Sequence, residues 1–210
     1  MADEIEAKYK VDTFAAVRRA LRRAGAAYLG TVLQTDLYYD TPGRDLLHGD
    51  IGLRIRLTRR LRRGSGAAKG RSDTRPLLTY KGPARPRSRV KIRKEIQTRF
   101  DDDRALGDIL AALGLELTLK IQKRRARYRL GRCRVELDEL PILGRFVEIE
   151  AAAARGVASA ARKLGLTGEP ICDHYVNLAL DACRLLGRKG PRREITFNCP
   201  GAESSHRPTR

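Results

Sequence analysis

Strict alternation of charged and apolar residues recurs along this chain and constrains its fold more than any other feature. In residues 4–11, EIEAKYKV, glutamate or lysine occupies every second position, and apolar residues occupy the positions between them. Successive side chains of a β-strand point to opposite faces of a sheet, so this period predicts strands with one charged and one apolar face. Strands are expected over residues 4–11, 31–39, 51–58, 77–81, 89–100, 119–130, 132–139 and 145–150.

Apolar residues at helical spacing interrupt the series of strands. Phe14, Val17 and Leu21 share one face of a helix that is expected over about 14–24. Each such amphipathic helix needs an apolar surface to cover. Further helices are expected after the three aspartates at 101–103, over 156–164 and over 173–186.

The charged strand faces carry few neutral polar residues. An antiparallel sheet with its charged side in water would explain the alternation, but such faces usually carry many Thr, Ser and Gln residues. A sheet that closes on itself explains both observations, because its apolar outer face can receive the helices while its charged faces line the interior. A lumen that holds both signs of charge is costly unless ligands and partner groups satisfy it, so we interpret it as a functional site. The sequence therefore predicts an α+β fold with a β-barrel, a charged lumen and about four flanking α-helices.

The balance of charges indicates an anionic partner. The chain has 44 Lys or Arg residues against 25 Asp or Glu residues, and its formal net charge is +19. Nucleic acid, a membrane surface and a phosphorylated small molecule are the candidates. No apolar run of about 18 residues predicts a membrane span, and aromatic residues at 5%, with no Trp, argue against a platform for single-stranded nucleic acid. No apolar signal segment is present at the N-terminus, so the cytoplasm is the expected location.

Charged residues on the predicted strands suit a metal-bound polyphosphate. Mg²⁺ takes oxygen ligands and typically uses one or two carboxylates together with substrate phosphates, and Arg and Lys bind phosphate oxygens. A nucleoside triphosphate with its metal ion would fit such a lumen. The candidate metal ligands are Glu4, Glu6, Glu148 and Glu150, with Asp138 and Glu136 as further carboxylates, and the candidate phosphate ligands are Lys8, Arg54, Arg56, Lys81, Arg93, Lys123 and Arg125.

Eight short motifs, in order along the chain, resemble the CYTH family, which is named for class IV adenylate cyclase and thiamine triphosphatase. The first is E-x-E-x-K at residues 4–8, and the resemblance covers about residues 3–186. The segments Q-x-D-x-Y at 34–38 and Y-K-G-P at 80–83 look most like the class IV adenylate cyclase branch. The other motifs are Q-T-D-L-Y-Y-D-T-P (34–42), L-R-I-R (53–56), T-Y-K-G-P (79–83), R-K-E (93–95), K-R-R (123–125), L-D-E-L-P-I-L-G-R-F-V-E-I-E (137–150) and H-Y-V-N-L (174–178).

The resemblance implies an eight-stranded antiparallel tunnel that binds a triphosphate with Mg²⁺ or Mn²⁺. The substrate would be ATP, inorganic triphosphate or thiamine triphosphate, and Glu4, Glu6 and Lys8 would be catalytic. By position in the family pattern, metal would be held by Glu4, Glu6 and Glu148 or Glu150, with Asp138 assisting, and phosphates would contact Lys8, Arg54, Arg56, Lys81, Lys123 and Arg125.

Three functions remain open on these residues. The first choice is a class IV adenylate cyclase, which converts ATP to cyclic AMP and pyrophosphate. The second is a triphosphatase that hydrolyses inorganic triphosphate, a nucleoside triphosphate or thiamine triphosphate. The third is a non-catalytic module for polyphosphate or RNA, although such a binder would need the cations more than the carboxylates.

The chain is expected to form one tunnel domain over residues 1–186. A basic and mostly disordered tail over 187–210 should follow it, and deletion of residues 188–210 should leave activity intact. The stretch 59–76, rich in Arg, Gly and Ser, predicts a flexible hairpin loop. The sequence leaves the oligomeric state open, with a homodimer as one alternative.

Overall fold

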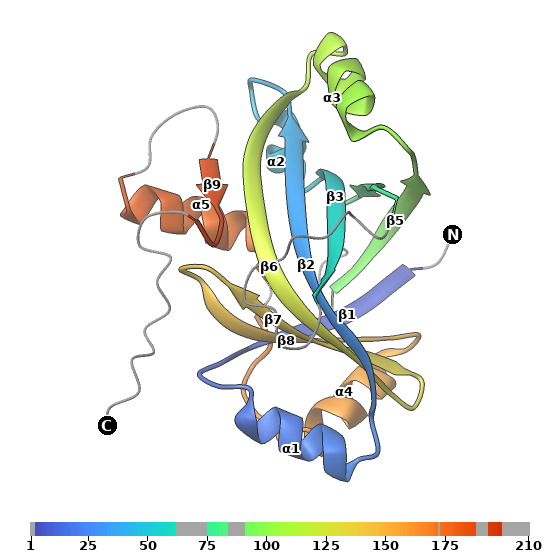
Figure 1. Ribbon diagram of the computed structural model, residues 1–210. Helices are drawn as coiled ribbons and strands as arrows, with labels where there is room; N and C mark the ends of the chain where they lie inside the picture. Colours follow the sequence, from blue (N-terminus) through green and yellow to red (C-terminus); the bar gives the residue numbers. More distant parts are fainter. Residues whose placement is uncertain (1–2, 62–74, 84–90, 172, 188–192, 199–210) are drawn as a thin grey trace.

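The computed structural model describes residues 3–61, 75–83, 91–171, 173–187 and 193–198, and eight of its strands form a closed antiparallel ring (Figure 1). These strands are β1 (Asp3–Val11), β2 (Ala27–Asp40), β3 (Gly52–Leu61), β4 (Leu77–Lys81), β5 (Lys91–Arg99), β6 (Glu116–Leu130), β7 (Cys133–Leu140) and β8 (Gly144–Ala151). Neighbours follow the order β2-β3-β4-β5-β1-β8-β7-β6, and antiparallel pairing between β6 and β2 closes the ring. The expected eight-stranded antiparallel barrel is therefore confirmed.

Strand β3 continues further than the sequence predicts. Its pairing with β2 extends to Leu61, which lies opposite Thr31. The expected loop over 59–76 therefore starts after Leu61, because the hydrogen-bonded ladder holds the preceding residues in the sheet. Residues 62–74 of that loop lie outside the described part of the chain.

Helices occupy the positions that the apolar spacing predicts, with one addition. The expected four are α1 (Ala15–Arg23), α3 (Asp103–Ala112), α4 (Ala154–Lys163) and α5 (Tyr175–Leu185). The addition is the single turn α2 (Asp45–His48), which Asp40 stabilises by accepting hydrogen bonds from the backbone nitrogens of Leu46 at 3.0 Å and Leu47 at 3.1 Å. None of the helices in the described segments has the length and apolar character needed to cross a membrane.

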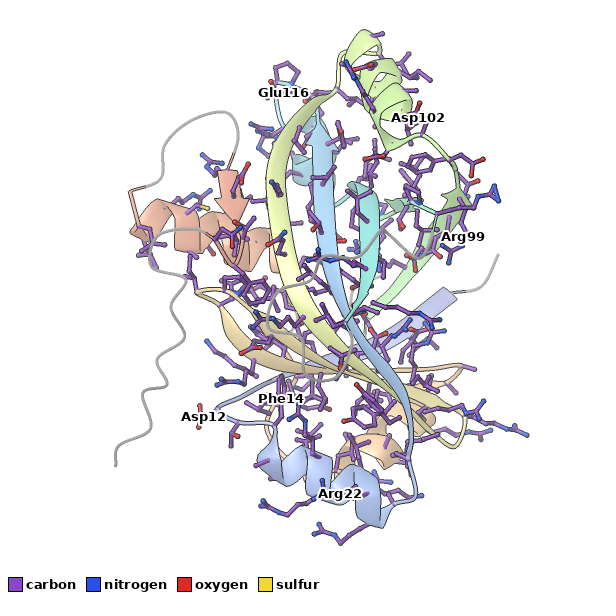
Figure 2. All side chains as sticks on the ribbon, in the orientation of Figure 1. Asp12, Phe14, Arg22, Arg99, Asp102 and Glu116 are labelled. Carbon is purple, nitrogen blue, oxygen red and sulfur yellow. The ribbon has the colours of Figure 1, made fainter. Side chains whose placement is uncertain are left out.

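The main apolar core lies outside the ring, where α1 and α4 cover the sheet (Figure 1). Leu21 of α1 and Val157 of α4 are buried in it against Val147 of β8. Phe14 joins the same core at the start of α1, while Arg22 of that helix is exposed (Figure 2). Each large apolar side chain buried in this way contributes roughly 1.5–3 kcal/mol. The apolar strand faces thus point outward, as the alternation predicts, and the charged faces point into the ring.

A second apolar cluster joins α5 and one further strand to the ring. Strand β9 (Arg193–Ile195) runs parallel to β6, and its Ile195 is fully buried beside Ile121. These residues depart from the tail without regular structure that the sequence suggests for 187–210. Three residues are too few to show a period, so only the contact with β6 reveals the strand.

Candidate active site

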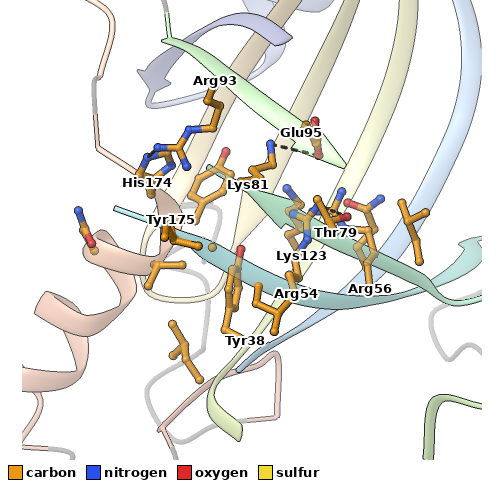
Figure 3. A pocket seen from close by; sticks show the side chains of 18 of the residues that line it. Tyr38, Arg54, Arg56, Thr79, Lys81, Arg93, Glu95, Lys123, His174 and Tyr175 are labelled. Atoms are coloured by element: carbon orange, nitrogen blue, oxygen red, sulfur yellow. Dashed lines mark hydrogen bonds and ion pairs between the residues drawn. The ribbon is translucent and has the colours of Figure 1, made fainter. Parts of the chain in front are cut away.

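A cavity of about 760 Å³ occupies the inside of the ring. Its wall contains all seven of the cationic side chains that the sequence proposes as phosphate ligands, and these come from five strands. Figure 3 shows Arg54, Arg56 and Lys123 gathered in one part of the wall, and Arg93 beside His174 in another. The seven cations are Lys8 of β1, Arg54 and Arg56 of β3, Lys81 of β4, Arg93 of β5, and Lys123 and Arg125 of β6.

Asp36 of β2 holds the two arginines of β3. Its oxygens accept hydrogen bonds from Nε of Arg56 at 2.6 Å and from Nη2 of Arg56 at 2.7 Å, and Nη1 of Arg54 lies 3.5 Å from Oδ2. Burial alone would raise the pKa of Asp36, but Arg56 and Arg54 outweigh it and hold that pKa well below its usual range. Burial would likewise lower the pKa of Arg56, and Asp36 reverses the effect. Arg56 therefore stays charged, and Asp36 fixes the direction of its guanidinium.

Arg125 of β6 contacts three carboxylates. It forms ion pairs with Glu136 and Asp138 of β7 and with Glu148 of β8. Burial would lower the pKa of Arg125, but Asp138, Glu136 and Glu148 raise it well above its usual value. Burial also favours a raised pKa for Glu148, yet Arg125 and the nearby lysines lower that pKa strongly. At Glu136 burial prevails, and the pKa is raised.

Lys123 lies two residues before Arg125 on the same face of β6. Its Nζ is 3.0 Å from Oδ2 of Asp138, and only 3% of the side chain is exposed. Burial, and then repulsion from Arg125, lower the pKa of Lys123 to about 8. The charge of this lysine therefore changes in the mildly basic range.

Tyr175, at the start of α5, connects this helix to the wall. Its hydroxyl donates to Oδ2 of Asp138 at 3.1 Å, and Nζ of Lys8 lies 3.8 Å from the centre of its ring. Lys8 also donates to the backbone oxygen of Asp173 at 3.1 Å and lies 3.6 Å from Oε1 of Glu148. Helix α5 therefore fixes the position of Lys8 and of the fully buried Asp138.

Arg93 connects β5 to the loop after α2 and to the start of α5. Its Nη2 lies 3.0 Å from Oδ2 of Asp50 and 2.8 Å from Nε2 of His174. Nearby in the wall, Nζ of Lys81 lies 3.6 Å from Oε1 of Glu95 (Figure 3). His174 thus contacts one of the proposed phosphate ligands.

Three of the carboxylates proposed as metal ligands lie on neighbouring strands. Glu6 of β1 is opposite Glu150 of β8, and Glu148 is opposite Lys8. All three glutamates line the cavity. Among the described residues, no three His, Cys, Asp or Glu side chains are arranged to hold a metal ion. Glu148 forms an ion pair with Arg125, and Glu150 lies 2.7 Å from Nη1 of Arg134.

The residues nonetheless fit a divalent cation in type and place. Carboxylate oxygens from two adjacent strands are the ligands that Mg²⁺ and Mn²⁺ prefer, provided that their ion pairs open. Asp138 fits less well, because it is fully buried and accepts hydrogen bonds from Lys123, Arg125 and Tyr175. For Glu4 the structure gives a backbone position opposite Arg93, and its side chain is outside the described set.

Sequence reasoning did not propose Asp36, which holds Arg56, nor Glu95 and Tyr175 among the residues of the wall. The alternation in 31–39 places Asp36 on one face with Gln34 and Tyr38, so this signal was available. Tyr175 had no such signal, because its contact with Asp138 depends on how α5 docks against the ring.

Comparisons with known proteins agree with this geometry. The sequence model of the CYTH domain family matches residues 2–169 of this chain. "Putative adenylate cyclase MJ0240" of Methanocaldococcus jannaschii is 29% identical over 147 residues, which are 70% of this chain and 75% of the relative. The structure of the PH1819 protein from Pyrococcus horikoshii OT3 is 27% identical and has a TM-score of 0.68, with 85% of this chain and 98% of that chain covered. "Putative adenylyl cyclase HpAC1" from Hippeastrum, described as revealing a dominant triphosphatase activity, is 18% identical with a TM-score of 0.61, and the match covers 90% of this chain and 98% of that one.

The matched region contains the complete eight-stranded ring, and α5 and β9 follow it. The family resemblance that the sequence motifs suggest is confirmed by this match. The chain belongs to the CYTH domain family.

Proposed function

We propose that this protein is a metal-dependent enzyme that acts on a triphosphate bound inside the ring. The observation that carries the proposal is the convergence of Lys and Arg side chains from five strands on one cavity that also contains Glu6, Glu148 and Glu150. A triphosphate chain spreads its negative charge over many oxygens, and Arg and Lys donors are suited to bind them. A smaller anion would leave most of these cations without a ligand.

The cations of the wall bind the phosphate oxygens, and buried carboxylates position them. Asp36 is a positioning residue because it holds Arg56 by two hydrogen bonds. Asp138 takes the same role toward Lys123 and Arg125, in place of the metal ligation that the family pattern implies.

Glu6, Glu148 and Glu150, together with Glu4, would hold the divalent cation. When bound, Mg²⁺ or Mn²⁺ would neutralise phosphate charge and lower the pKa of the attacking hydroxyl or water. Glu148 would then exchange its contacts with Lys8 and Arg125 for the cation, which releases one contact of each basic side chain for phosphate oxygens.

The first candidate reaction is that of a class IV adenylate cyclase. The 3′-hydroxyl oxygen of ATP forms a bond to the α-phosphorus, the bond from that phosphorus to pyrophosphate breaks, and the hydroxyl proton is released. The cationic wall stabilises the charge that develops on the departing pyrophosphate. The name of the Methanocaldococcus jannaschii relative supports this candidate.

The second candidate is a triphosphatase, in which water attacks the terminal phosphorus and orthophosphate is released. The substrate would be inorganic triphosphate, a nucleoside triphosphate or thiamine triphosphate. The description of the Hippeastrum protein, which reports a dominant triphosphatase activity, supports this alternative. A non-catalytic module for polyphosphate or RNA is less well supported, because glutamates in the cavity would repel a polyanion that carries no metal ion.

Parallel incubation with ATP, inorganic triphosphate and thiamine triphosphate tests the proposal. Each substrate is supplied with Mg²⁺ or with Mn²⁺, and the products are identified by chromatography. Cyclic AMP with pyrophosphate would establish the cyclase, and orthophosphate the triphosphatase. Tight binding of all three substrates without turnover under any condition would overturn the enzyme assignment.

A further inference from the structure

The two ends of the cavity differ in chemistry. Near the hairpin between β6 and β7, the wall is charged and includes Arg127 and Arg134. The opposite end lies between α2, α5 and the start of β3, and its apolar lining residues are Leu47, Ile51, Leu53, Leu119, Val176 and Leu180. This apolar end also contains polar side chains, among them His48, Asn177 and Arg184. An end that combines apolar surface with hydrogen-bonding groups suits an organic group with polar edges better than it suits further phosphates.

Strand β9 adds an arginine to this apolar end. Arg193 of β9 lies opposite Leu119 of β6 in the strand register. Leu119 in turn lies opposite Tyr38 of β2, and Tyr38 lies opposite Arg54 of β3. All four side chains line the cavity. Because neighbouring strands are ~4.8 Å apart, Arg193 is about 14 Å from Arg54 across the sheet. It therefore lies beyond the group of cations around Arg54 and Arg56.

The guanidinium of Arg193 has a hydrogen-bond donor that the described part of the chain leaves without an acceptor. Its Nε is buried, and within the described residues nothing accepts a hydrogen bond from it. A buried donor without an acceptor costs free energy, which a ligand with an acceptor atom would recover. This donor and the apolar side chains around it are the features of a binding subsite.

Contacts along β9 hold Arg193 in place. Ile195 is fully buried, and Nζ of Lys120 lies 3.5 Å from Oε2 of Glu194. Farther along, the backbone nitrogen of Phe197 donates to Oε1 of Gln122 at 3.2 Å. The position of Arg193 is therefore set by the fold.

We propose that this end of the cavity binds the nucleoside of a nucleoside triphosphate, and that Arg193 is a specificity-determining residue that donates to the base. The proposal rests on the proposed function, since it requires the triphosphate chain to lie at Arg54 and Arg56. A base offers ring nitrogens and carbonyl oxygens as acceptors, and its planar face packs on guanidinium and apolar side chains. The same guanidinium repels the cationic thiazolium ring of thiamine triphosphate.

The test compares the affinities of Arg193→Ala and the unchanged protein for ATP and for inorganic triphosphate, measured by titration calorimetry with Mg²⁺ present. The substitution should weaken ATP binding about tenfold, the effect of losing one hydrogen bond from a charged donor, and should change inorganic triphosphate binding by less than about twofold. Equal weakening for both ligands, or no change for ATP, would overturn the role of Arg193.

Two further variants separate a binding role from a structural one. Glu194→Gln changes the neighbouring residue of β9, which does not line the cavity, and should leave both affinities unchanged. Arg193→Lys keeps the charge but loses the Nε donor, so it should still weaken ATP selectively. If Arg193→Lys bound ATP as tightly as the unchanged protein, or bound ATP and inorganic triphosphate equally more weakly, the proposal would be contradicted even if Arg193→Ala failed to fold. If the unchanged protein bound no inorganic triphosphate, the proposed function itself would fail.

Discussion

The carboxylate of Asp36 and the guanidinium of Arg56 form a two-point hydrogen-bonded pair across β2 and β3, with nitrogen–oxygen distances of 2.6 and 2.7 Å. Both side chains are almost excluded from solvent, at 3% and 11% exposed. The pair points the arginine into the cavity without leaving its charge unbalanced. Removing the carboxylate would leave two arginines without their counter-charge.

Asp36→Asn should therefore lower the free energy of unfolding by about 3–5 kcal/mol, the usual effect of breaking a buried ion pair. Pairing lowers the pKa of Asp36 in the folded chain. Its stabilisation is thus complete above the pKa of the unfolded chain and declines as the pH falls below about 4. Urea denaturation at several pH values measures both effects. The same acid sensitivity in Asp36→Asn and in the unchanged protein would contradict this prediction.

Triphosphate affinity should fall as the pH rises through about 8, because the pKa of Lys123 lies there and its charge is then lost. The measurement is the affinity of the unchanged protein for inorganic triphosphate divided by that of Lys123→Gln at each pH. Ionisation of the ligand affects both affinities equally and therefore does not change this ratio. This ratio should decline by up to about tenfold per pH unit above the pKa. Lys120→Gln, outside the cavity, is the matched control, and a ratio independent of pH would exclude Lys123 as the titrating cation.

Glu6→Gln should abolish metal-dependent turnover and leave stability nearly unchanged, because it removes one negative charge from the cavity without a change in volume. Binding of Mn²⁺, followed by electron paramagnetic resonance, should weaken at least tenfold with the loss of one carboxylate ligand. Glu139→Gln is the control, since Glu139 belongs to β7 and does not line the cavity. Unaltered Mn²⁺ binding and turnover in Glu6→Gln would remove Glu6 from the metal site.

Ile195→Ala should lower the free energy of unfolding by about 2–4 kcal/mol, because it opens a cavity in the cluster beside Ile121. Glu194→Ala, on the same strand, breaks a half-exposed ion pair and should change stability by at most about 1 kcal/mol. Denaturant unfolding of both variants compares the two effects. Equal stability of Ile195→Ala and the unchanged protein would mean that β9 is not part of the folded core in solution. Deletion of 188–210, which the sequence suggests is harmless, should destabilise the chain in the same way.

The ring of strands could be predicted from the sequence because its signal is local. The alternation in 4–11 and 51–58 is readable without knowing any partner strand, and it also predicts which face carries the charges. Lys8 and Arg54 line the cavity for that reason. Strand β9 has no such signal, since three residues are too short for a period.

Other parts of the site depend on contacts between distant segments. Tyr175 reaches Asp138 only because α5 docks against the open end of the ring. The lowered pKa of Lys123 arises from burial and from Arg125, and neither can be read from the residue type alone. Charge pairing inside the cavity is similar, because the alternation predicts that Arg125 points inward but not which carboxylates it meets.

The separation of the apolar core from the cavity has a consequence for how such a protein can change. The side chains that hold α1 and α4 to the sheet lie on its outer face, whereas the ionic groups lie on its inner face. Alternate residues of a single strand therefore have different roles. The outward-facing residues stabilise the fold, and the inward-facing residues form the site. A lineage with this architecture can exchange one inward-facing residue for another, and so change what the cavity binds, while the scaffold keeps its outer packing.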